Sequence, residues 1–131
     1  AMAYRMIDAR KMAMDIAETG RVALYGIYFD TAKAEIKAQS QATLKEIAQL
    51  LKTQPDLKLV VVGHTDNQGA LDYNMELSTR RAQAVRDALV QDHGIAPARL
   101  SAWGAGYLAP VASNRSEAGR AKNRRVELVE Q

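Results

Sequence analysis

The 131-residue sequence contains no cysteine, only three prolines and only seven aromatic residues. The absence of cysteine excludes a disulfide-stabilised scaffold and a metal site with thiolate ligands. Because aromatics are scarce, Leu, Val, Ile, Ala and Met must fill the core. No apolar run reaches about 18 residues, so the sequence predicts no membrane-spanning helix. The 47% of hydrophobic residues is nevertheless enough for a globular core.

The length and the ends of the chain set the expected domain organisation. A chain of 131 residues is one domain by size, with room for a small appendage. No secretory signal is visible, and the opening AMAYRM reads as the cut end of a longer chain. We therefore expect residues 1–20 to be an N-terminal helix or a linker from an upstream domain, and residues 21–131 to be the domain itself. The net charge of +3 weakly favours anionic binding partners.

Hydrophobic periodicity predicts alternating helices and strands. Gly20 is a natural stop for the first helix, Ser40 is a candidate N-cap, and the run after Lys58 is apolar enough for a strand covered on both faces. The expected helices cover residues 2–18, 40–52 and 74–92, and the expected strands cover residues 22–30, 57–63, 99–106 and 124–131. Residues 107–120 are expected to form a long loop or a short irregular helix.

The order of these elements predicts an α+β fold. After the first helix the order is β-α-β-α-β-β, a mixed sheet with helices packed on it. Two successive strand–helix–strand units imply right-handed crossovers and partly parallel strands. The last two strands are expected to pair in an antiparallel or mixed arrangement.

Arg81 lies on the apolar stripe of the helix at residues 74–92, four residues from both Leu77 and Val85. A guanidinium in that position needs a partner, because an uncompensated buried charge is unfavourable. Arg80 is turned about 100° away on the helix and has Glu76 four residues before it. The two neighbouring arginines are therefore expected to have different roles.

Asp66 follows directly after the apolar strand at residues 57–63. Ligands gather beyond the carboxyl ends of strands in open α/β sheets, and the turn after Asp66 leads to the helix of Arg81. Arg124 alternates in phase with Val126 and Leu128, so we expect it to point inward and Arg125 to point outward with Glu127. Asp66, Arg81 and Arg124 thus predict a small polar pocket at one rim of the sheet.

Several simpler interpretations compete with a pocket. Asp66 and Arg81 could form a structural ion pair, and Asn74 could serve only as a helix cap. A metal site at His64 and Asp66 lacks a third ligand, so we expect no metal and no cofactor. Neither Thr65 nor Ser78 has a neighbouring base that would activate its hydroxyl as a nucleophile. The stretch GRAKNRR at residues 119–125 lacks the aromatics of a nucleic-acid site.

Four segments together resemble the OmpA-like C-terminal domain family, the peptidoglycan-binding domains of Gram-negative outer-membrane proteins and lipoproteins. They are YFDTAKAEIK, VVVGHTDNQGALDYNMELSTRRAQAV, RLSAWGAG and PVASNRSEAGRAKNRRVEL. The motifs GHTDNxG, YNxxLSxxRA and GRAxNRRV occur in the family's order and spacing over residues 24–130. The family fold, β-α-β-α-β-β with a mixed sheet, agrees with the order of elements above.

The resemblance implies a non-catalytic peptidoglycan-binding protein of the periplasm, associated with the outer membrane or the cell wall. The family holds the diaminopimelate side chain of the stem peptide, which implies that Asp66 binds its ammonium and Arg81 its carboxylate. Asn74 and Arg124 resemble supporting members, and Thr65 stands beside Asp66 in the same motif. The segment of Asp30 and Thr31 resembles one that lines the pocket partly through its backbone. Some relatives have Asn where this chain has Ala32.

The ligand implied by the family also accounts for the isolated charges. A zwitterionic amino-acid end presents an ammonium and a carboxylate together, which suits one Asp and one forked Arg. Two other functions stay open at this point. The domain could fix a larger, stator-like envelope assembly to the wall, or it could belong to a cell-wall hydrolase, although no catalytic constellation is evident.

Overall fold

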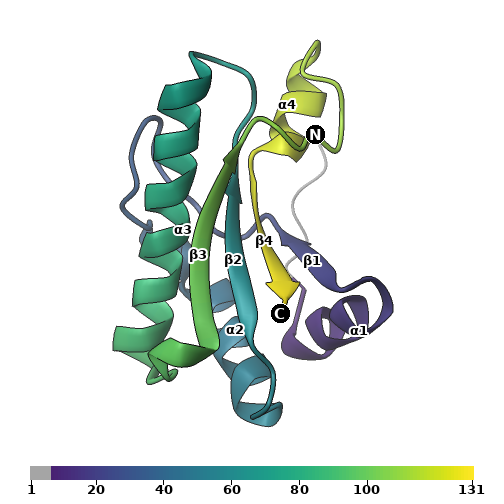
Figure 1. Cartoon of the computed structure of the whole chain (residues 1–131), viewed down its shortest axis with the longest axis vertical. Coiled ribbons are helices and arrows are strands. Elements are labelled where there is room, and N and C mark those ends of the chain that lie inside the picture. The colour runs from purple at the N-terminus through teal and green to yellow at the C-terminus, as the bar shows by residue number, and fades with distance from the viewer. Residues whose placement is uncertain (1–6) are drawn as a thin grey trace.

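The computed structural model describes residues 7–131 and contains a four-stranded sheet with three helices packed against one face (Figure 1). Two short 3₁₀ turns, Ala38–Ser40 and Pro97–Arg99, precede α2 and β3. The elements in chain order are α1 (Ala9–Thr19), β1 (Arg21–Leu24), α2 (Gln41–Thr53), β2 (Leu59–His64), α3 (Leu71–His93), β3 (Leu100–Gly106), α4 (Glu117–Asn123) and β4 (Arg125–Glu130).

The strands lie in the order β1-β4-β2-β3, which confirms the predicted mixed sheet and the α+β class. β2 and β3 pair in parallel, and β4 runs antiparallel to both β1 and β2. The expectation that the last two strands pair is wrong, because they are not neighbours. The crossover through α3 places β3 beside one edge of β2, so β4 occupies the other edge.

The core lies between the sheet and the helices α1, α2 and α3. Leu59 and Val61 of β2 share one face with Leu128 of β4, and all three side chains are fully buried. The predicted stripe of α2 is buried as a set: Leu44, Ile47, Ala48 and Leu51. α1 adds Met12 and Ile16 to the same core. The boundary proposed at residue 20 stays a prediction, but α1 packs on the sheet rather than standing apart.

Several element boundaries differ from the predicted ones. The first helix begins at Ala9 because the carboxylate of Asp8 accepts the Lys11 N–H at 2.9 Å and caps it, and the predicted residues 2–6 lie outside the described part of the chain. The first strand stops at Leu24, where the chain leaves the sheet. Ser40 precedes α2 but does not cap it; its hydroxyl accepts the Tyr28 N–H at 2.8 Å and so holds the departing segment.

Three glycines allow α3 to lie very close to β2 and β3. A Cβ at Gly63 would overlap the backbone of Ser78, and a Cβ at Gly104 would overlap the side chains of Ser78 and Thr79. At Gly106 a Cβ would lie 2.7 Å from the Met75 sulfur. Because Ser78 and Thr79 of α3 lie directly against Gly63 and Gly104, the first turns of α3 are fixed against the carboxyl end of β2.

Candidate functional site

Asp66 lies just beyond the carboxyl end of β2, in the loop that leads to α3. Its residue exposure is only 8%. One carboxylate oxygen accepts the Gln68 N–H at 2.9 Å and the other accepts Nη1 of Arg124 at 2.8 Å. The loop closes through Gly69, whose φ of +86° lies in the region that glycine tolerates best. The carboxylate is therefore fixed in place by one backbone and one charged donor.

Asn74 braces this loop from inside α3. Its side-chain amide donates to the carbonyls of Gln68 at 2.8 Å and Ala70 at 3.0 Å. The interpretation of Asn74 as a helix cap is wrong, because α3 begins at Leu71 with Ala70 in the cap position. Since Asn74 is almost fully buried and lines the cavity described below, it connects the Asp66 loop to the helix that carries Arg81.

Two hydroxyls beside the loop are engaged with the backbone. Thr65 donates to the carbonyl of Asp66 at 2.8 Å. Ser78 donates to the carbonyl of Met75 and accepts the Gly106 N–H, each at 3.0 Å. These bonds give both hydroxyls a structural role between β2, β3 and α3.

Arg81 ties a second loop to α3. Its Nε donates to the carbonyl of Lys33 at 2.8 Å and its Nη2 to the carbonyl of Asp30 at 3.1 Å. The guanidinium carbon lies 4.8 Å from the centre of the Phe29 ring, within cation–π range. Burial lowers the pKa of Arg81, while the nearby Tyr73 and Asp66 act in the opposite direction. Partial burial on a helix stripe agrees with the helical phase read from the sequence.

The structural ion pair between Asp66 and Arg81 is not formed. Within residues 7–131, no carboxylate lies within 4.0 Å of the Arg81 guanidinium, whereas Asp66 pairs with Arg124. Arg81 uses two of its nitrogens on carbonyls, which leaves N–H groups on Nη1 for another acceptor. The site thus contains the positive charge of Arg81 and the negative charge of Asp66, which do not pair with each other.

The predicted phase of Arg124 and Arg125 is wrong. Arg125 is buried rather than outward; its Nε donates to Glu127 at 2.6 Å and its Nη2 to the Ala109 carbonyl at 3.0 Å. Arg124 keeps 41% of its side chain exposed. The alternation fails because Arg124 lies between α4, which ends at Asn123, and β4, which begins at Arg125, and because both faces of β4 are buried at this end. Arg124 nevertheless reaches Asp66.

A cavity of about 910 Å³ joins these groups at the end of the sheet. It lies between the loop after β2, the first turns of α3, the segment after β1 and the junction of α4 with β4. Of the predicted site residues, Asp66, Arg81, Asn74, Arg124, Thr65 and Thr31 line it. Asp30 does not; its carboxylate pairs with Lys37 at 3.0 Å and only its carbonyl serves the site, by holding Arg81. Ala32 lines the cavity with a φ of +61°.

Two further features of the cavity were not among the expectations from the sequence. Four of the chain's seven aromatic residues line it: Tyr25, Tyr28, Phe29 and Tyr73. His64 also lines it, with a buried Nδ1 that lacks a partner. Burial, and then the charge of Arg125, lower the pKa of His64 to about 4, so the ring is neutral at pH 7. The opposite charges of Arg125 and Glu127, two residues apart, were the available sign of a buried polar cluster.

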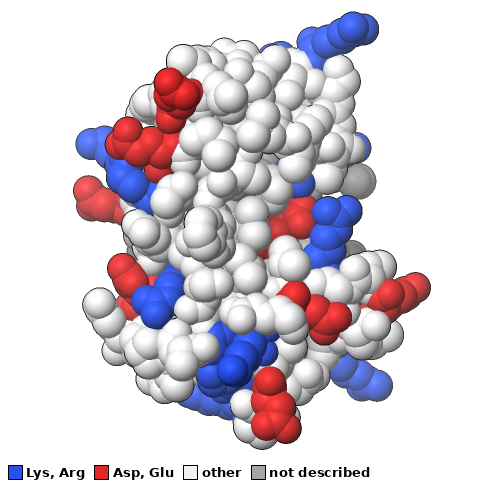
Figure 2. Space-filling view, in the orientation of Figure 1, with Lys and Arg blue, Asp and Glu red and all other residues white. Residues whose placement is uncertain are grey.

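The described residues form neither a charged patch in the view of Figure 2, nor a metal site, nor a membrane-spanning helix. On the face shown in Figure 2, basic and acidic side chains are scattered around a broad uncharged area instead of gathering in one patch. In the described part of the chain, no three His, Cys, Asp or Glu residues are grouped to hold a metal ion. Among residues 7–131, none of the helices is both long and apolar enough to cross a membrane.

The geometry defines an α+β domain with a polar cavity at the carboxyl end of β2. Comparison with known proteins shows which family this domain belongs to. Residues 28–124 match the OmpA family. The chain is 46% identical over 112 residues to outer membrane porin F of Pseudomonas aeruginosa, covering 86% of this chain and 32% of the porin. The chain therefore belongs to the OmpA family. It spans about a third of the length of the porin F relatives that it matches.

Two solved structures share the fold. The peptidoglycan-associated lipoprotein of Burkholderia pseudomallei is 40% identical, with a TM-score of 0.72 over 80% of this chain and 88% of that one. The cell wall anchor of the T6SS from Pseudomonas aeruginosa is 34% identical, with a TM-score of 0.73 over 98% of this chain and 100% of that one.

Proposed function

We propose that this chain binds peptidoglycan without cleaving it, by holding the diaminopimelate side chain of the stem peptide in the cavity beyond β2. The observation that carries the proposal is that Asp66 and Arg81 line one cavity without pairing with each other. Asp66 accepts the ligand ammonium, and the free N–H groups of Arg81 donate to the ligand carboxylate. Membership of the OmpA family, and the similarity to a peptidoglycan-associated lipoprotein and to a cell wall anchor, support the choice of peptidoglycan.

The remaining residues hold these two groups in position. Asn74 and Thr65 fix the Asp66 loop, Arg124 orients its carboxylate, and Thr31 lines the cavity. Asp30 acts through its carbonyl on Arg81. A site preorganised in this way binds with little further loss of conformational freedom.

The cellular setting that follows is the periplasm, where the domain anchors an outer-membrane or periplasmic protein to the cell wall. A stator-like assembly fixed to the wall would use the same cavity in the same way. A wall hydrolase has less support, because the hydroxyls of Thr65 and Ser78 are occupied by backbone groups. Incubation with purified diaminopimelate-type sacculi, followed by analysis of released muropeptides, separates retention from cleavage.

The sharpest test compares, by calorimetry on one protein sample, stem peptides that carry diaminopimelate, amidated diaminopimelate or lysine at the same position. The α-amino and α-carboxyl groups of a peptide-linked lysine are in peptide bonds, so its side chain ends in an ammonium alone and Arg81 would be desolvated without an acceptor. An unmatched buried charge costs on the order of 2–5 kcal/mol, which is roughly a 30-fold to several-thousand-fold loss of affinity. Lysine binding within about threefold of diaminopimelate would contradict the role of Arg81.

Three substitutions test the assignment of roles. Asp66→Ala and Arg81→Ala are each expected to abolish retention by sacculi while circular dichroism shows a folded chain. Arg81→Lys keeps the charge but loses the planar fork, so it should bind more weakly than the parent chain. Arg80→Ala is the matched control, because Arg80 pairs only with Glu76 on the exposed face of α3. A loss with Arg80→Ala as large as that with Arg81→Ala would overturn the assignment.

A further inference from the structure

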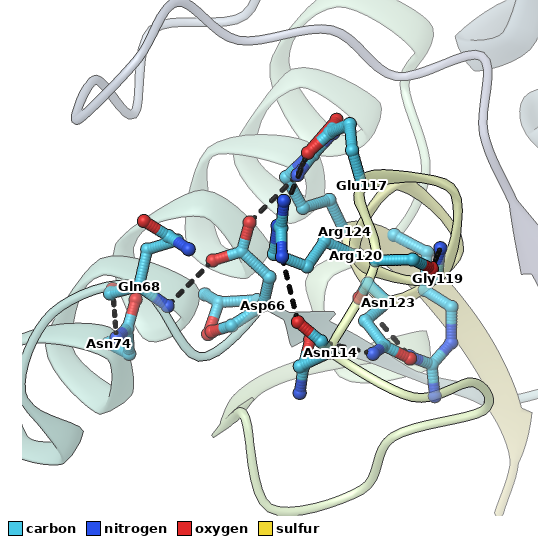
Figure 3. A network of polar contacts seen from close by, with 12 residues as sticks. Asp66, Gln68, Asn74, Asn114, Glu117, Gly119, Arg120, Asn123 and Arg124 are labelled. Carbon is cyan, nitrogen blue, oxygen red and sulfur yellow. Dashed lines mark hydrogen bonds and ion pairs between the residues drawn. The ribbon is translucent and has the colours of Figure 1, made fainter.

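Glu117, on the first turn of α4, reaches into the network that holds Asp66 (Figure 3). Its two carboxylate oxygens accept Nη2 of Arg124 at 2.7 Å and Nη1 of the same guanidinium at 3.3 Å. That Nη1 also donates to Asp66 at 2.8 Å. One guanidinium therefore bridges two carboxylates, one inside the cavity and one at its edge.

This bridge bears on how Asp66 can receive a positively charged ligand. Arg124 occupies one oxygen of the same carboxylate that the proposed function assigns to the ammonium. A second guanidinium, Arg120, approaches Glu117 at 3.4 Å and donates to the Asn114 carbonyl at 2.8 Å. The two arginines alone would leave the surroundings of Asp66 with an excess positive charge, which repels an ammonium.

Glu117 removes that excess. With Asp66 and Glu117 both ionised, the two carboxylates balance the charges of Arg120 and Arg124. Without Glu117, the remaining three side chains, those of Asp66, Arg120 and Arg124, carry a net charge of about +1 at neutral pH. Hydrogen bonding and charge from Arg124, followed by the weaker contribution of Arg120, lower the pKa of Glu117 and keep it ionised. Glu117 also holds Arg124 from the side away from Asp66, because its closer contact is to Nη2.

We propose that Glu117 is a positioning residue that determines selectivity, by making the site favour ligands with an ammonium over ligands with carboxylates alone. The inference rests on the proposed function, since it concerns the same cavity. It goes further by assigning the selectivity for a zwitterion to a residue that does not line the cavity and that acts through Arg124.

The test compares Glu117→Gln with the parent chain against two probes. Diaminopimelate carries two ammonium and two carboxylate groups, and pimelate is the same seven-carbon chain with the carboxylates alone. Loss of one exposed charge near the site of the ammonium should weaken diaminopimelate binding roughly threefold. Pimelate binding should be unchanged or stronger, so the ratio of the two affinities should fall. The difference should shrink in high salt, which screens exposed charges.

Two variants serve as controls. Glu117→Asp keeps the charge and should restore most of the parent ratio. Glu18→Gln makes the same change of net charge on the exposed surface of α1, which contributes no residue to the cavity, and should leave the ratio unchanged. NMR titration suits both probes because it measures millimolar affinities.

The possible outcomes separate this inference from the function beneath it. If the parent chain fails to bind diaminopimelate, both the proposed function and this inference are contradicted. If the parent binds and Glu117→Gln weakens both probes equally, or leaves diaminopimelate unaffected, only the role of Glu117 is overturned. A selective loss for diaminopimelate that Glu117→Asp restores supports it.

Discussion

Two pairs of adjacent arginines occupy different kinds of environment. In α3, Arg81 is half-buried and holds a loop, whereas Arg80 lies in solvent and pairs with Glu76 at 3.4 Å. At the start of β4, both arginines are held by carboxylates: Arg124 by Asp66 and Glu117, and Arg125 by Glu127.

The difference follows from the geometry of the two elements. A helix turns neighbouring residues about 100° apart, so one charge of a pair can remain in water. In the second pair, Arg125 is the first residue of β4 and is buried, whereas Arg124 lies between α4 and β4 and keeps 41% of its side chain exposed. Arg125 is therefore held in a buried ion pair and Arg124 in a partly exposed one, so the two pairs should respond differently to substitution.

The largest difference is expected within the second pair. Arg125→Ala leaves Glu127, whose side chain is 4% exposed, with the mostly exposed Arg21 at 3.5 Å as its remaining arginine partner. Breaking a buried ion pair costs about 3–5 kcal/mol of unfolding free energy, and the contact with Arg21 places the expected loss at the lower end of that range. Arg124→Ala removes a half-exposed guanidinium and should cost about 1 kcal/mol or less. Urea denaturation measures both, and equal losses would show that the burial of Arg125 is unimportant.

His64, which pairs in register with Arg125 across β2 and β4, should make stability depend on pH. Its pKa is lowered to about 4, so on acidification the unfolded chain takes up a proton near pH 6.5 and the folded chain only near pH 4. The unfolding free energy should therefore fall as the pH drops through this window, by about 3 kcal/mol in total from this residue. His64→Gln should flatten that part of the urea-derived pH profile, and an unchanged slope would argue against a buried neutral ring.

A smaller difference is expected within the first pair. Arg81→Ala removes two bonds to carbonyls and a cation–π contact, which together should cost about 1–2 kcal/mol of stability. Arg80→Ala should change stability by about 0.5 kcal/mol or less, because its ion pair is exposed. Thermal denaturation of the two variants side by side is sufficient, and a reversed order would mean that the helical phase is misassigned.

The smallest effect concerns the loop that Arg81 holds. Ala32 adopts a φ of +61°, which is unfavourable for a residue with an unbranched apolar side chain. Asn adopts this conformation more readily, so Ala32→Asn should raise stability by about 0.5–1 kcal/mol. The gain should appear as a higher melting temperature. An unchanged melting temperature would show that the positive φ of Ala32 does not lower the stability.

Much of the fold could be predicted because long periodic segments carry their own pattern. The stripe of α2 and the phase of Arg81 in α3 depend on 3.6-residue repeats over several turns, and both were confirmed. The mixed sheet followed from the order of elements. The family motifs also located six of the residues that line the cavity, although their roles toward a ligand stay predictions.

The errors share a different cause, because each depends on contacts between distant segments. Ser40 was predicted to cap α2, but its hydroxyl is used by Tyr28, twelve residues earlier. The alternation around Arg124 was extended beyond the end of the strand, and only the fold shows that α4 reaches Asn123. The sequence of β4 does not show which strands it pairs with, because the position of β4 depends on the edge of β2 that β3 occupies after the crossover through α3.

The central position of β4 has a consequence for synthesis of the protein. β1 at residues 21–24 pairs in the described sheet with β4 at residues 125–130, about a hundred residues later. A ribosome releases β1, β2 and the helices between them well before the strand that lies between β1 and β2. During that interval β1 has no hydrogen-bonding neighbour and the hydrophobic faces of α1 and β1 lack the buried Val126 and Leu128. Pairing between such distant segments is slow, so the nascent chain reaches its folded form only after translation of β4.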